Sequence, residues 1–171
     1  MNAAPSMKSR LAMVFGSLLI LDFILVIVML ATDKNLQTDF GSSSAYYIHW
    51  YAGLGIGVIT LLAALFILAT AGRTTADGKP TGMSRLGVLG GTAWAWLVVV
   101  GLFGVVATYS QVGFASASQF ARYLFGVSAY PGSLSYIPWL YDVVIAVYIL
   151  SAIVGVVALI QIRAAARQTS S

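Results

Sequence analysis

Four long apolar stretches, separated by shorter polar segments, dominate the pattern of this sequence. They cover residues 11–31, 48–71, 86–109 and 139–162. Each reaches the roughly 20 predominantly apolar residues that a helix needs to cross the hydrocarbon core of a membrane. A transmembrane β-barrel would instead show segments of about 10 residues that alternate between apolar and polar positions. Runs such as 61–69 and 97–107 are apolar on every side, so the pattern predicts four membrane-spanning helices.

Composition supports the same fold class. About 60% of the 171 residues are hydrophobic and 8% are charged, whereas soluble domains carry roughly 25% charged residues. At roughly 150 residues per domain, the length corresponds to one unit. We therefore expect residues 1–171 to form a single membrane domain, an all-α integral membrane protein built as a four-transmembrane-helix bundle.

The basic residues predict the orientation of these spans. One group lies beside the ends of the chain and between the second and third spans: Lys8, Arg10, Arg73, Lys79, Arg85, Arg163 and Arg167. The opposite side holds Lys34 and Arg122. Because Lys and Arg favour the cytoplasmic side, both termini are predicted to be cytoplasmic in the plasma membrane, with 32–47 and 110–138 outside. The first span is too long for a signal peptide, and we expect it to be retained.

Small residues spaced four apart occur in all four spans, more weakly in the first, where Ala12 and Gly16 form the pair. Small residues at this spacing allow helix backbones to approach closely, which is the main source of helix association in lipid. The helix-packing candidates in the other three spans are Gly53, Gly57, Gly87, Gly91, Ala95, Ser151 and Gly155. They are expected to pack within the bundle, and the alternative is an interface with another membrane subunit or a second copy of the chain.

The outer loop at 110–138 is long for a connection between two helices, and Arg122 is its one charged residue. Its aromatic residues interleave with small ones, which predicts a short helix lying in the membrane interface. Tyrosine and tryptophan also gather around the outer ends of the spans, as in an aromatic belt. The alternative is a docking surface or a groove in contact with a lipid or a quinone.

Several kinds of chemistry are excluded by residue counts. The chain has no cysteine, which rules out disulfides, thiolate metal sites and iron-sulfur clusters. It has one histidine, His49, and no glutamate, so neither bis-histidine haem ligation nor a histidine-rich metal site is expected within it. Basic residues lie in scattered loops rather than along one face, which excludes nucleic acid as a partner. No catalytic, metal or cofactor residues are predicted, and the chain is not expected to be an enzyme.

Asp22 is the most informative polar residue, because it falls near the middle of the first span. An ionised carboxylate at that depth costs at least about 2.5 kcal/mol. Three alternatives compensate for this cost: a hydrogen bond to Ser, Thr or Tyr of a neighbouring helix, a polar contact with another subunit, or a hydrated path for protons or cations.

A second polar cluster is predicted at the outer surface, from His49, Arg122 and Asp142. An ion pair between Arg122 and Asp142 would fix the outer loop. The alternative is a pH-sensitive or ligand-binding site, since histidine titrates near neutral pH.

Together these observations favour a non-catalytic accessory subunit of a larger membrane complex, such as a respiratory or other membrane oxidoreductase complex, with a role in assembly or stability. Its partners would be other integral membrane subunits and lipids. One alternative is a small proton or cation channel or carrier that uses Asp22. Another is a membrane enzyme, or a quinone- or lipid-binding protein, that uses His49, Arg122 and Asp142.

Overall fold

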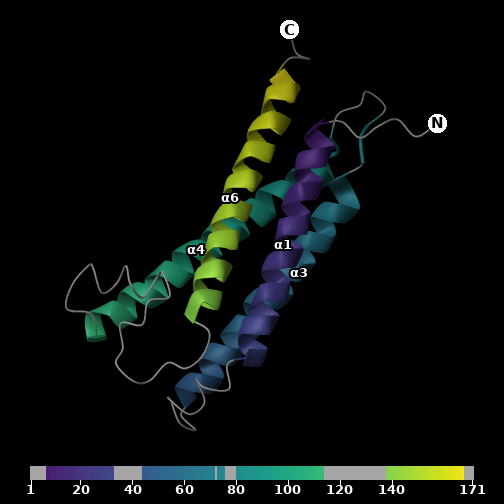
Figure 1. The fold of residues 1–171 in the computed structure, drawn as a ribbon. Helices are drawn as coiled ribbons and strands as arrows, with labels where there is room; N and C mark the ends of the chain where they lie inside the picture. The colour runs from purple at the N-terminus through teal and green to yellow at the C-terminus, as the bar shows by residue number, and fades with distance from the viewer. Residues whose placement is uncertain (1–6, 33–43, 72, 76–79, 114–137, 168–171) are drawn as a thin grey trace.

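A computed structural model of the chain describes residues 7–32, 44–71, 73–75, 80–113 and 138–167. These residues form four α-helices: α1 (Met7–Thr32), α3 (Ser44–Ala71), α4 (Gly82–Gly113) and α6 (Pro138–Arg167) (Figure 1). No strand occurs within these ranges. Each helix contains a stretch that is long and apolar enough to cross a membrane: 10–31, 51–71, 82–101 and 143–164. The prediction of an all-helical protein with four such helices is therefore confirmed.

All four helices extend beyond the apolar stretches from which they were predicted. The third stretch was predicted at 86–109, whereas α4 begins at Gly82 and ends at Gly113. Hydropathy marks the part of a helix that matches the hydrocarbon core, but the helical hydrogen bonds continue into the more polar interface. The outer loop is shortened accordingly, because its first residues belong to α4. The interfacial helix predicted within it lies outside the described residues.

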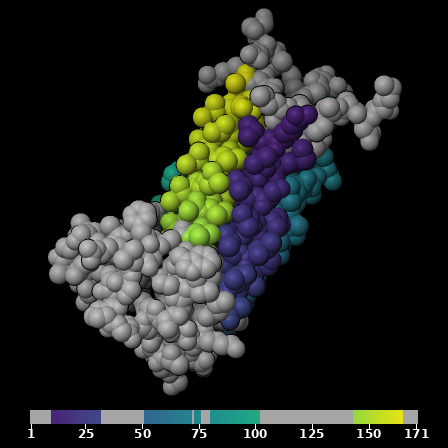
Figure 2. Space-filling model, in the orientation of Figure 1, coloured from purple at the N-terminus to yellow at the C-terminus, as the bar shows by residue number. Residues whose placement is uncertain are grey.

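The helices form a ring in which each packs against two neighbours. Helix α1 contacts α3 and α6, and α4 contacts the same two helices from the opposite side. Consecutive helices run in opposite directions, so the start of α1, the end of α6 and the connection from α3 to α4 lie at one end of the bundle (Figure 1). Figure 2 shows α1 and α6 side by side along one face.

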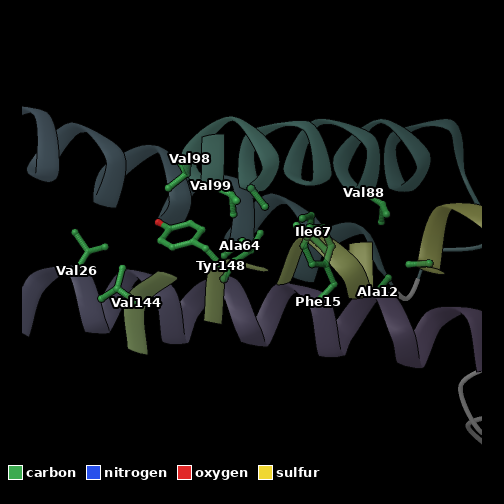
Figure 3. Close-up of a cluster of buried hydrophobic side chains, with 14 of the residues drawn as sticks. Ala12, Phe15, Val26, Ala64, Ile67, Val88, Val98, Val99, Val144 and Tyr148 are labelled. Carbon is green, nitrogen blue, oxygen red and sulfur yellow. The ribbon is translucent and has the colours of Figure 1, made fainter. Parts of the chain in front are cut away.

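Buried side chains from all four helices fill the centre of the ring (Figure 3). Phe15 and Leu19 of α1 and Ile67 of α3 are fully or almost fully buried. The opposite faces of the helices expose large apolar side chains, including Leu62 and Val100. Such a surface suits contact with lipid, because acyl chains are as apolar as these side chains.

The predicted small-residue positions face into the bundle. On α3, Gly53 lies against Leu30 and Gly57 lies against Val26, both on α1. On α4, a Cβ atom added at Gly91 would lie 2.6 Å from Ile67 of α3 and 3.1 Å from the Phe15 ring of α1. The remaining predicted positions are buried in the same way: Gly87, Ala95, Ser151 and Gly155. These residues therefore allow close packing within this chain.

Backbone hydrogen bonds connect the end of α3 with the residues before α4. The Arg73 amide donates to the Thr70 carbonyl at 3.0 Å, and the Thr81 amide donates to the Arg73 carbonyl at 3.2 Å. The Thr81 hydroxyl then accepts a hydrogen bond from the Ser84 amide at 3.3 Å. This is the N-cap geometry that satisfies an otherwise unpaired amide in the first turn of a helix, so Thr81 fixes the start of α4.

Candidate functional site

The interior of the described bundle contains a layer of polar side chains to which all four helices contribute. We call it the central polar layer, and it consists of Asp22, Thr60, Trp94, Tyr148 and Ser151. Antiparallel packing brings these residues to one depth, because each lies in the middle part of its apolar span. Their contacts join residues up to 129 positions apart in the sequence.

Asp22 of α1 is paired with Ser151 of α6. The Ser151 hydroxyl donates to Oδ2 of Asp22 at 2.7 Å, and both residues are fully buried, with 0% of their surface exposed. This geometry corresponds to the hydrogen-bonded alternative for Asp22. A contact with another subunit would need an exposed carboxyl group, which Asp22 does not present. Its second oxygen, Oδ1, is buried and has no hydrogen-bond partner.

Thr60 of α3 is the centre of a second hydrogen-bonded group. Its hydroxyl lies 2.7 Å from the Ile56 carbonyl, 2.7 Å from the Tyr148 hydroxyl and 2.9 Å from Nε1 of Trp94. A threonine has one hydroxyl proton and two lone pairs. The carbonyl can only accept and the indole can only donate, so the Thr60 proton goes to Ile56. Tyr148 must then donate its own proton to Thr60.

Next to this layer, α4 and α6 approach each other through a threonine and a glycine. The Thr92 hydroxyl donates to the Val88 carbonyl of its own helix at 2.6 Å. A Cβ atom added at Gly155 would collide with this hydroxyl and would lie 3.1 Å from the Phe15 ring. Gly155 therefore sets the distance between these helices, and it thereby positions Ser151 one turn away on the same helix face.

The described basic side chains of the spans lie far from this layer. Arg10 and Arg163 are exposed near the end of the bundle that also holds the turn between α3 and α4. Arg10 precedes Asp22 by 12 positions, which corresponds to about 18 Å along a helix. Asp22 therefore has no cation at its own depth within the part of the chain that the structure describes.

The predicted outer cluster cannot be assembled from the described side chains. His49 falls within α3 and Asp142 within α6, but the side chains of both, and all of Arg122, lie outside the described part of the chain. Among the described residues, no group of three His, Cys, Asp or Glu side chains could hold a metal ion.

Three residues of the central polar layer, Thr60, Trp94 and Tyr148, were not predicted as site residues. Trp94 lies well inside an apolar span, and its indole N–H requires a hydrogen-bond partner when buried. Tyr148 carried the same kind of signal: unlike the other tyrosines, it lies deep in an apolar span. A buried tyrosine hydroxyl requires a hydrogen-bond partner, and that requirement could have identified it.

Comparison with known proteins yields no relative: no protein-family model matches this chain, and no curated protein or solved structure matches it. Chemically, most polar atoms of the central polar layer are engaged in holding helices together. The exception is Oδ1 of Asp22, which is buried and uncommitted.

Proposed function

We propose that this protein is a non-catalytic subunit of a larger membrane complex, in which a rigid four-helix bundle supports assembly or stability. The central polar layer supports a structural role, since its hydrogen bonds connect α1 to α6 and tie both α4 and α6 to α3. Such bonds between membrane helices typically contribute about 0.6 kcal/mol each. A bundle joined in this way can present a constant outer surface to its partners.

The outward face of α4 is the observation that carries this proposal. Gly90 and Gly101 are exposed, and a Cβ atom added at either one would meet nothing within 4 Å. Exposed Ala93 and Leu97 lie between them at helical spacing. Small residues on a lipid-facing surface leave room for a second helix to approach closely. The attachment surface is therefore the exposed face of α4 that carries Gly90, Ala93, Leu97 and Gly101.

In the membrane, we place both termini and the turn between α3 and α4 on the cytoplasmic side. Four described arginines near this end support the placement: Arg10, Arg73, Arg85 and Arg163. Basic residues beside span ends favour the cytoplasm. The outer end of the bundle, with the segment between α4 and α6, would then face the exterior and be available to cap a partner.

The test compares glycine replacements on different faces of the bundle. The full-length protein is extracted from its own membrane in mild detergent, and the masses of the intact assemblies are measured by native mass spectrometry. The wild type should carry larger subunits at fixed stoichiometry. The double substitution Gly90→Leu and Gly101→Leu should release them, whereas Gly55→Leu should not, although Gly55 also faces open space on α3.

Other results of this experiment would contradict either the proposed function or the proposed attachment surface. If the wild type is recovered alone or only as multiples of itself, it is not a subunit of a larger complex. If the α4 double variant keeps its partners, α4 is not the attachment surface. Gly91→Leu serves as the folding reference, because its side chain would collide with Ile67 inside the bundle and reduce the yield of folded monomer itself.

A further inference from the structure

Among the described residues, two buried side-chain polar atoms have no hydrogen-bond partner: Nε of Arg85, near the start of α4, and Oδ1 of Asp22, at the centre of the bundle. Oδ2 accepts the Ser151 hydroxyl, while Oδ1 has no partner although the residue is fully buried. Buried polar atoms in native proteins are almost always satisfied by protein or by water. An unsatisfied carboxyl oxygen inside four packed helices therefore indicates that something small binds there.

The oxygen atoms available around Oδ1 of Asp22 determine which ligand can bind there. Metal cations such as Ca²⁺ and Mg²⁺ need about six oxygen ligands. Asp22 and Ser151 supply three oxygens, and the Thr60 hydroxyl is already engaged with Ile56, Tyr148 and Trp94. A proton needs a single oxygen. The ligand that fits is a proton, with water as the acceptor for the resulting O–H group and as the species that delivers and removes the proton.

The surroundings of Asp22 favour binding of a proton over a permanent charge. A carboxylate buried without a cation is strongly disfavoured in hydrocarbon. On α1 the nearest described cation is Arg10, three turns away. On α6 the described titratable residue in this layer is Tyr148, and its hydroxyl already donates its proton to Thr60. The described parts of α3 and α4 contribute Thr60 and Trp94 to this layer, and neither titrates.

We propose that Asp22 is an exchangeable proton-binding site at the centre of the bundle. In the closed bundle the carboxyl group is the neutral acid, and Ser151 orients it. When water reaches the central polar layer, the acid transfers its proton to water, which leaves a carboxylate and a hydronium ion. The reverse transfer restores the acid. This site does not depend on the proposed attachment surface, and it can be tested without any partner.

Infrared spectroscopy can test this proposal on the full-length protein in vesicles of ether lipids, which lack the ester carbonyl that absorbs in the same range. A protonated carboxyl group has a carbonyl band separate from the amide bands. The chain has five aspartates and no glutamate, so very few groups can contribute to it. The wild type should show one such band, and Asp22→Asn should abolish it. A variant carrying asparagine at the other four aspartates, Asp33, Asp39, Asp77 and Asp142, should retain the band.

Two further measurements distinguish a proton that exchanges between Asp22 and water from a proton that stays permanently on Asp22. The band should shift when the vesicles are moved into D₂O, and it should disappear reversibly when the pH is raised. Ser151→Ala should keep the band but move its position, because the carboxyl group loses a hydrogen bond; this variant remains informative if Asp22→Asn fails to fold. The proposal is wrong if the band is absent, if it survives Asp22→Asn, or if it does not shift in D₂O.

Discussion

Thr60 and Tyr148 lie on helices that are diagonal to each other in the ring, yet their hydroxyl oxygens are 2.7 Å apart. Their contact therefore crosses the centre of the bundle rather than joining neighbours. Trp94 donates to the same threonine from α4. This arrangement makes Thr60 the common partner of two helices and leads to specific expectations for its variants.

Tyr148→Phe removes the hydroxyl that donates to Thr60 while it keeps the buried ring. We expect a loss of about 0.6 kcal/mol, with an upper bound of about 1.7 kcal/mol, since interhelical hydrogen bonds in membranes fall in this range. Unfolding of the detergent-solubilised protein would measure it. In a double-mutant cycle, Tyr148→Phe should cost less in a Thr60→Val background. Equal costs in both backgrounds would show that the contact contributes nothing.

Gly155→Ala should destabilise the bundle by about 1–3 kcal/mol, the usual cost of overpacking a well-packed core. The new methyl group would press on the Thr92 hydroxyl and the Phe15 ring. Removing the Thr92 side chain by Thr92→Ala should restore part of the loss. Gly101→Ala is the matched control, because its site is open, and its unfolding free energy should stay near the wild-type value.

Thr81→Ala should weaken the first turn of α4, because the Ser84 amide loses the side-chain oxygen that it donates to. Loss of an N-cap typically costs about 1 kcal/mol. Hydrogen exchange of the amides at the start of α4 should become faster, whereas Thr81→Ser should preserve their protection. If both variants exchange alike, the hydroxyl does not cap this helix.

The absence of native cysteine allows the proposed orientation to be mapped with single introduced thiols. Thr74→Cys, in the exposed turn between α3 and α4, should react with an impermeant maleimide added from the cytoplasmic side. Ala31→Cys, exposed at the opposite end of α1, should react from the exterior. The reverse pattern would invert the proposed topology.

The glycines of α4 show where prediction from sequence reached its limit. Gly87, Gly90 and Gly91 lie within five residues of one another, and spacing alone marked Gly87 and Gly91 as a packing stripe. They do pack, but within the chain, against Phe66, Ile67 and Phe15. Gly90 faces outward instead. A small-residue pattern identifies a face on which helices can approach closely, but it does not show which helix approaches it.

The spans, their number and the importance of Asp22 follow directly from the amino-acid sequence, because they depend on how each segment interacts with lipid. Twenty apolar residues make a spanning helix regardless of its neighbours, and a lone carboxyl group in such a segment is costly in any arrangement. The partners of Asp22 and Tyr148 depend on something else. Ser151 reaches Asp22, and Thr60 reaches Tyr148, only at the observed rotation and register of the antiparallel helices. Many side-chain contacts between the helices together determine this rotation and register.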